Sequence, residues 1–400
     1  MIREPGPARL WLAGLMVSIM RWLEMLAFGL YALSATGSPL LVALTVLCRM
    51  TPLLLASPLL LALAERGDRR LALVRAFAAM SLVFGALLVL ELSRGAGIGA
   101  VLLASLAGGL FWAIEFPLRR TMLAELGGLG RVGASMGLEI FANQVTRVLG
   151  AVLGGAGVAW LGLAGVFATG LLLYGLGAAV ILRIPARSPR SAISAAVHPL
   201  ARLREGMRAV RRNGLLLATI AISAAFNLFA FPYVALAPVI AERRHGLTAA
   251  GTGLLLACEP LAATLAALLF ARLLPDRLFR LSYALGPLLF VSGTALFALA
   301  GSLGAAAAAL ALAGLGMAGF TIGQMVLPLR AAPPELRAQV VGLVTSSIGV
   351  APLGLLQAGL LAEAYGAFLA QLVISCGGIF AFLLVLLRWP ELRQLRPPEG

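Results

Sequence analysis

The chain of 400 residues is 61% hydrophobic and only 12% charged, and its mean hydropathy is +1.00. A soluble domain holds about half apolar and a quarter charged residues, so this composition excludes a water-soluble globule and fits a protein embedded in a lipid bilayer. The net charge of +15 comes from arginines. Because these arginines gather in alternate loops between apolar segments, we expect no nucleic-acid partner.

Apolar segments long enough to cross a bilayer as a helix, about twenty residues each, recur along the whole chain. The first begins at Leu10 and is too long for the apolar core of a cleavable signal peptide, so we expect it to be retained. The predicted fold class is an all-α membrane protein with twelve transmembrane helices. Their expected ranges are 10–33, 40–63, 71–92, 97–118, 136–160, 163–184, 214–239, 247–271, 280–300, 303–328, 339–362 and 366–388.

Three uncharged connectors, at 34–39, 161–162 and 301–302, join neighbouring spans. The longest break, at 185–213, is rich in proline and arginine, and we expect it to be a basic cytoplasmic linker. Contact of its positive charge with anionic membrane lipids is an alternative to a simple solvated topology signal. The predicted domains are an N-terminal six-helix bundle (1–184), the linker (185–213), a C-terminal six-helix bundle (214–388) and a cytoplasmic tail (389–400).

Arginine placement also predicts the orientation, since cytoplasmic loops of membrane proteins are enriched in Lys and Arg. With the N-terminus in the cytoplasm, only Arg94, Arg243 and Arg244 fall in outside loops. Both termini are therefore expected in the cytoplasm. The expected location is the bacterial inner (plasma) membrane, which the chain crosses many times.

The two halves repeat each other in register. Pro52 and Asp68-Arg69 in the first half recur, with the same spacing, as Pro260 and Asp276-Arg277 in the second. Two further matches are Pro117-Leu118-Arg119 with Pro328-Leu329-Arg330, and Gly154 and Gly162 with Gly359 and Gly366. Such duplication is typical of secondary transporters, whose substrate sites lie near the membrane midplane between the repeats.

Two motifs resemble the major facilitator superfamily. Leu61 to Arg70, LALAERGDRR, resembles the family's loop motif G-x-L-A-D-R-x-G-R-R, with departures at Leu61, Glu65 and Asp68. Gly150 to Gly155, GAVLGG, is similar to the exporter motif G-P-x-x-G-G, with Ala151 in place of the proline.

The wider pattern resembles the drug and siderophore exporter branch, which includes the enterobactin exporter and macrolide efflux pumps. The residues that carry this likeness are Tyr31 to Ser38, Pro117, which is expected to close the fourth span, and Pro334 to Arg337. The resemblance covers the whole chain and implies two pseudo-symmetric bundles that work by alternating access, with export driven by inward proton movement as in an antiporter. It also implies a cytoplasmic gate at Glu65, Arg66, Asp68 and Arg69.

Ionisable side chains inside the apolar spans cost about 2.5–3.5 kcal/mol each on insertion scales, so each is a candidate for function. The candidates for substrate binding or coupling are Arg21, Glu24, Arg49, Glu139, Asn143, Arg147, Asn227 and Glu259. Arg21 and Glu24 are neighbours on one helix surface, and Glu139, Asn143 and Arg147 share one stripe.

Two interpretations of these charges stay open. In one, Arg21, Arg49 and Arg147 neutralise Glu24 and Glu139, and the network holds helices together. In the other, the cluster lines a cavity that binds a charged substrate, and a buried carboxylate loads and releases a proton. Glu115 is expected to form a plain salt bridge with Arg119, which the span boundaries place in a cytoplasmic loop.

Aromatic residues are sparse, and Trp22, Trp112, Phe226 and Tyr233 are the candidates for a cavity wall, with packing against helices or lipid as the alternative. The three cysteines are far apart and lack nearby His, so we expect neither a metal site nor a cofactor. No catalytic motif is present, which predicts that the chain is not an enzyme.

The functional hypothesis is a monomeric, proton-coupled exporter of an amphiphilic organic solute, siderophore-like or drug-like. One alternative is an importer or facilitator of an anionic metabolite that uses Arg21, Arg49 and Arg147. Another is a non-transporting membrane receptor or lipid-moving protein built on a transporter fold.

Overall fold

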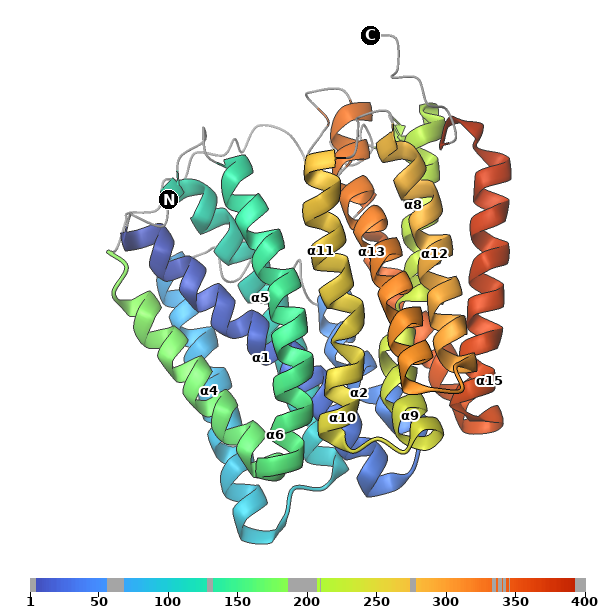
Figure 1. Cartoon of the computed structure of the whole chain (residues 1–400). Helices are drawn as coiled ribbons and strands as arrows, with labels where there is room; N and C mark the ends of the chain where they lie inside the picture. Colours follow the sequence, from blue (N-terminus) through green and yellow to red (C-terminus); the bar gives the residue numbers. More distant parts are fainter. Residues whose placement is uncertain are drawn as a thin grey trace. The chain divides into compact units, whose positions relative to one another are not determined.

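The computed structural model describes residues 5–55, 68–127, 132–185, 207–208, 210–273, 278–332, 336, 340, 343–344 and 346–392, and they form helices and short connections without a strand. The chain separates into two compact units (Figure 1). Unit 1 comprises Met1–Ser191 with Ala241–Ala257, and unit 2 comprises Ala192–Ile240 with Cys258–Gly400. The loop motif before Asp68, most of the linker and the end of the tail lie outside the described residues.

Unit 1 is built around the first helix. Its helices are α1 (Pro5–Thr36), α2 (Pro39–Leu55), α4 (Arg69–Arg94), α5 (Ile98–Gly127), α6 (Val132–Leu182) and α10 (Ala249–Leu256). α6 packs along α1, α4 and α10, and α5 packs along α2. Four aromatic rings fill the space between α1, α4, α5 and α6 in edge-to-face or tilted contacts, and these are Phe77, Phe84, Phe111 and Tyr174.

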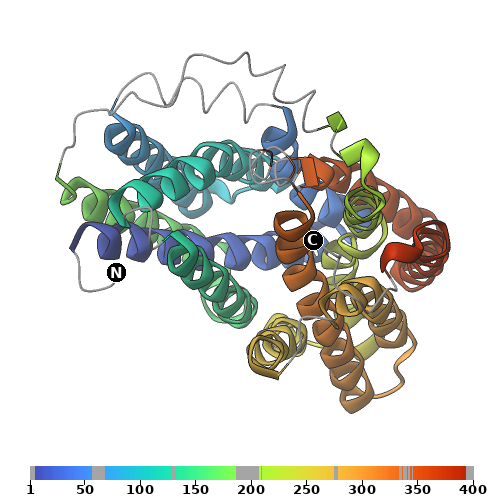
Figure 2. The same ribbon diagram turned by 90° about the horizontal axis from the view of Figure 1, so that it is seen from above.

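Unit 2 holds the remaining described helices. These are α8 (Gly214–Ala225), the π-helical turn η2 (Phe226–Ala230), most of α9 (Tyr233–His245), α11 (Cys258–Leu273), α12 (Phe279–Leu299), α13 (Leu303–Ala331), η5 (Ser347–Val350), α15 (Ala351–Arg388) and η6 (Pro390–Leu392). Seen from above, the helices of this unit are viewed nearly along their axes, so they run side by side as a bundle (Figure 2). α13 packs between α11 and α12.

Two long helices are each interrupted at a glycine. At 1.5 Å per residue, the 51 residues of α6 would span roughly twice a bilayer if they were straight. Gly162 (φ 63°, ψ −164°) interrupts α6, and Gly366 (φ 83°, ψ 154°) interrupts α15. In Figure 1, both α6 and α15 turn back along their length. The predicted connector at 161–162 is therefore confirmed, and Gly366 occupies the matching place in unit 2.

The described part of the chain contains nine helices that are long and apolar enough to cross a membrane, and a shorter apolar helix at Pro39–Pro52. The expectation of an all-α membrane protein is confirmed. The expectation that Pro117 closes a helix is wrong, because α5 continues through Pro117 to Gly127. Proline removes one backbone donor, but within a membrane protein neighbouring groups can satisfy the freed carbonyl, so the helix need not stop.

Gly366 tests the importance of the break in α15. Its backbone conformation is accessible almost only to glycine, so we expect Gly366→Ala to destabilise the fold by about 1–3 kcal/mol. Gly304→Ala is the matched control, because a Cβ at Gly304, inside α13, meets nothing within 4 Å. Thermal melting in detergent should show a lower midpoint for the first variant alone. Equal melting midpoints would show that the backbone conformation at position 366 does not require glycine.

Candidate functional site

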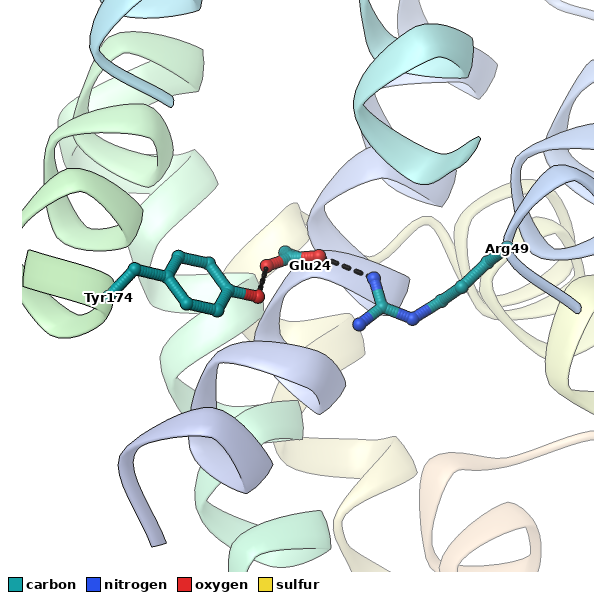
Figure 3. Close-up of polar contacts among 3 residues, drawn as sticks. All are labelled: Glu24, Arg49 and Tyr174. Carbon is teal, nitrogen blue, oxygen red and sulfur yellow. Dashed lines mark hydrogen bonds and ion pairs between the residues drawn. The ribbon is translucent and has the colours of Figure 1, made fainter. Parts of the chain in front are cut away.

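A buried triad of Glu24, Arg49 and Tyr174 joins three helices of unit 1 (Figure 3). Arg49 Nη1, from α2, donates to Glu24 Oε2 on α1 and forms an ion pair with it. Tyr174 OH, from α6, donates to Glu24 Oε1 at 2.8 Å. Both oxygens of this fully buried carboxylate therefore accept a hydrogen bond, which is the condition under which a buried ion pair is tolerated.

A glycine on α5 makes room for this triad. A Cβ added at Gly108 would lie 2.8 Å from Arg49 Nη1 and 3.3 Å from Glu24 Oε2. Any larger residue would therefore push into the ion pair. Tyr174 and Gly108 were not among the candidates from the sequence, although a tyrosine inside an apolar span is a signal, since its buried hydroxyl needs a partner.

A second buried pair lies entirely on α5, where Arg119 Nε and Glu115 Oε1 form an ion pair one turn apart. The predicted salt bridge is present, but its predicted surroundings are wrong. Arg119 is 2% exposed and lies within the helix, not in a solvated loop. It faces Gly14 of α1, where an added Cβ would lie 2.6 Å from Arg119 Cζ.

Arg21 differs from these two arginines because no carboxylate among the described residues forms an ion pair with it. Its side chain is 4% exposed, and its Cζ lies 4.6 Å from the centroid of the Trp112 ring. No described residue forms a hydrogen bond or ion pair with Arg21, and its Nε is a buried donor without a partner there. Glu115 attracts it only over a longer range, while Arg49 and Arg119 repel it.

The charge balance of this interior is positive. Among the described residues buried in unit 1, the guanidiniums are those of Arg21, Arg49 and Arg119, and the carboxylates are those of Glu24 and Glu115. Because each of these carboxylates is engaged in an ion pair by Arg49 or Arg119, Arg21 is the buried cation to which the described residues offer no ion-pair partner. An uncompensated charge in low dielectric is costly unless a ligand or water meets it.

Residues near Arg21 carry further hydrogen-bond donors that have no partner among the described residues. The indole Nε1 atoms of Trp22 and Trp112 are buried without a hydrogen-bond partner in the described part of the chain, as is Arg49 Nε. Arg147 Cζ lies 5.2 Å from the centroid of the Trp22 ring, a second cation–π contact. These residues of unit 1 therefore supply donors and positive charge, which suits a ligand that supplies acceptors and negative charge.

Four sequence candidates lie in unit 2. Asn227 falls in the π-helical turn η2, a type of distortion that is frequent at functional sites. Phe226 stacks on Phe320 with ring centroids 3.9 Å apart, and Tyr233 packs edge-on against Phe290. Glu259 is buried in the first turn of α11.

The structure describes some of the remaining sequence candidates and leaves others outside the described residues. Glu65, Arg66 and the side chain of Glu139 lie outside the described part of the structure. Asn143 is half-buried on α6. Asp68 caps α4, whose first residue is Arg69: the Asp68 carboxylate accepts hydrogen bonds from Arg70 N (2.8 Å) and Leu71 N (3.4 Å).

Comparison with known proteins identifies the class. The model of the Major Facilitator Superfamily matches residues 10–281, more than half of the chain. The chain therefore belongs to the major facilitator superfamily, and it is a multi-pass membrane transporter of that type. Among curated proteins, no matching sequence is found.

Solved structures of transporters share this fold. A bacterial homologue of the human lysosomal transporter Spinster, inward-facing and unoccupied, has a TM-score of 0.77 and 14% identity, covering 99% of this chain and 100% of that one. A mutant of the nucleoside transporter NupG has a TM-score of 0.76 and 12% identity, covering 95% and 99%. A POT family transporter in complex with 5-aminolevulinic acid has a TM-score of 0.75 and 12% identity, covering 97% of each chain. At these identities the likeness shows the fold alone.

Proposed function

We propose that this transporter exports an amphiphilic organic solute that carries an acidic group, siderophore-like or drug-like, in exchange for protons across the bacterial inner membrane. The observation that supports the acidic group is Arg21, a buried guanidinium to which no described residue offers a carboxylate at ion-pair distance. A guanidinium presents several donors in a planar fork that matches a carboxylate or phosphate. A solute anion would supply the negative charge that no described residue brings to ion-pair distance of Arg21.

The aromatic neighbours support the apolar part of the solute. Trp112 and Trp22 each offer a large ring surface and an indole N–H that no described residue accepts. Aromatic side chains with an unsatisfied polar tip are typical of sites where a ligand is apolar at one end and polar at the other. This combination favours an amphiphile over a small inorganic anion.

The arrangement of twelve spans in two six-helix bundles, with both termini in the cytoplasm, is part of the proposal. That number is supported by the nine long apolar helices found in the described part of the chain, by the division of α6 and α15 at glycine, and by the short helix α2. The side of the membrane on which each connection lies rests on the arginine distribution.

For coupling to protons we favour Glu259 over Glu24. In the triad, both oxygens of Glu24 already accept hydrogen bonds, one of them from the Arg49 guanidinium. Glu259 is a buried carboxylate on a different helix, α11, and an ionisable residue at such a depth is a proton-relay candidate. We expect Glu259→Gln to abolish flux driven by a pH gradient in proteoliposomes while solute counterflow, which needs no net proton movement, continues. Unchanged gradient-driven flux would exclude Glu259 from coupling.

The acidic group is tested by matched probes. Aryl carboxylates and sulfonates, each paired with its uncharged amide, are screened for their effect on the melting temperature of the purified protein. We expect the acids, and not the amides, to stabilise it, because a ligand that binds the native state raises its stability. Equal effects of acids and amides would refute anion recognition. Flux of the hits into vesicles under pH gradients of either sign then separates export from import, and binding without flux would favour a receptor.

The gate at Asp68 yields a separate prediction. Asp68→Ala removes the cap of α4 and should cost about 1 kcal/mol, whereas Asp68→Ser keeps a capping oxygen and removes only the charge. If the charge gates the cytoplasmic side, both variants lose flux while only the alanine variant melts at a lower temperature. Full flux in the serine variant would show that Asp68 acts as a helix cap alone.

A further inference from the structure

A chain of hydrogen bonds inside unit 2 fixes how one amide side chain is oriented. Tyr283 OH donates to the backbone oxygen of Thr219 at 2.9 Å, and Ser223 Oγ lies 3.0 Å from Tyr283 OH. Gln324 Nε2 lies 2.9 Å from Ser223 Oγ. Each hydroxyl carries one proton. Because Tyr283 gives its proton to Thr219, Ser223 must donate to Tyr283, and Gln324 must then donate its N–H to Ser223.

A second amide is held the same way. Asn227 Nδ2 donates to the backbone oxygen of Ser223 at 2.8 Å, and a carbonyl can only accept, so the nitrogen of this amide also points toward Ser223. In both side chains the carbonyl oxygen is therefore turned away from Ser223. Among the described residues, none donates a hydrogen bond to Asn227 Oδ1 or Gln324 Oε1. Gln324 is half-buried and Asn227 is 7% exposed, so both amides lie largely inside the unit.

The two amides flank a stack of aromatic rings. Phe226, which precedes Asn227, stacks on Phe320 at 3.9 Å with planes 7° apart, and Tyr283 lies parallel to Phe320 at 5.7 Å. Phe320 stands one helical turn before Gln324 on α13. The π-helical turn at 226–230 sets the position of Asn227, and such turns are frequent at functional sites. Two fixed acceptors beside an apolar stack have the composition of a small-molecule subsite.

We propose that Asn227 and Gln324 form a subsite in unit 2 that binds a hydrogen-bond donor of the transported solute, a hydroxyl or an amine, through their two carbonyl oxygens. This inference rests on the proposed function, and it adds that the solute carries a donor group as well as an acid. Tyr283 and Ser223 act as positioning residues, because they decide which end of the Gln324 amide meets the solute.

Neutral probes test the subsite independently of Arg21. Binding of 2-naphthol, 2-naphthylamine and 2-methoxynaphthalene to the purified full-length protein is measured by calorimetry. The first two donate and the third only accepts. We expect wild type to prefer each donor by about fivefold, the worth of one neutral hydrogen bond. Gln324→Met and Asn227→Leu should each reduce this preference toward unity. If the preference falls only for 2-naphthol, the subsite binds a hydroxyl, and if it falls only for 2-naphthylamine, the subsite binds an amine.

Two further variants serve as a control and as a test of the positioning residues. Gln371→Met changes another buried amide of unit 2, whose Nε2 donates to Ser375 Oγ at 3.0 Å, and it should leave the donor preference intact. Tyr283→Phe keeps the ring but ends the proton chain, so Gln324 becomes free to rotate and binding of the methoxy probe should gain relative to 2-naphthol. A merely structural role of Tyr283 would not move that ratio.

The proposal is overturned if wild type shows no donor preference, or if the preference survives in both the Gln324 and Asn227 variants. The preference for an acid over its amide depends on negative charge and therefore reports on Arg21, whereas the three naphthyl probes are uncharged. Failure there with a donor preference intact would refute the proposed anion and leave the subsite standing. The reverse result would refute the subsite alone.

Discussion

Glu24→Gln is expected to lower the free energy of unfolding by about 3–5 kcal/mol, the cost of leaving a buried charge without its partner. Arg49 is 2% exposed, and Glu24 is the only described carboxylate that pairs with it. A glutamine keeps an acceptor for Arg49 but removes the negative charge, and its amide nitrogen cannot accept the hydrogen bond that Tyr174 OH donates to Glu24 Oε1. Chemical unfolding in detergent micelles measures the loss.

The double variant Glu24→Gln with Arg49→Met is the matched control. Removing both charges should recover most of the stability, because a neutral pair in a buried site is often as stable as an ion pair. Tyr174→Phe removes one hydrogen bond to the carboxylate and should cost less, about 1–3 kcal/mol. If the single Glu24 variant is as stable as wild type, the triad does not hold α1, α2 and α6 together. Recovered stability without recovered flux would assign the triad a role in transport as well.

Arg21→Gln is expected to have the opposite signature, with lost binding and no loss of stability. Removing one partner of a buried charge pair costs about 2–5 kcal/mol of binding, so the affinity for an acidic probe should fall at least about 30-fold. The protein itself loses an uncompensated buried charge, so its melting temperature should stay the same or rise. Calorimetry with the acid hits, beside thermal melting, measures both quantities.

Two arginine variants control for charge and shape. Arg75→Gln removes an exposed arginine from α4 and should leave acid binding unchanged. Arg21→Lys keeps the charge but loses the planar fork and weakens the contact with Trp112, so binding should be intermediate. A lower melting temperature of Arg21→Gln, together with unchanged acid binding, would mean that Arg21 serves the fold and not the solute.

Hydropathy and local turn signals were enough to predict most of the helix boundaries. The break at Gly162 and the start of α8 at Gly214 follow the predicted boundaries, since uncharged glycine connectors and a capping Asn213 are local signals. The end of α5 was mispredicted because a proline at the membrane boundary is ambiguous. Its effect depends on whether tertiary neighbours satisfy the carbonyl one turn earlier, and no local pattern contains that information.

The partners of the buried charged side chains could not be predicted from the sequence. Arg21 and Glu24 are three residues apart, which favours a pair on one helix, but Glu24 pairs instead with Arg49 and Tyr174, which lie far away in the chain. Tertiary packing turned Arg21 onto Trp112. The amide orientation at Gln324 was equally invisible, because it follows from a chain of hydroxyl protons that only the assembled helices define.

The most direct test of the account compares binding of one aryl carboxylate and its amide to wild type and to Arg21→Gln. We predict that wild type prefers the acid by at least about 30-fold, and that the variant, with an unchanged melting temperature, binds both probes equally weakly. A preference for the acid that persists in the Arg21 variant would contradict the claim that this buried guanidinium recognises the solute.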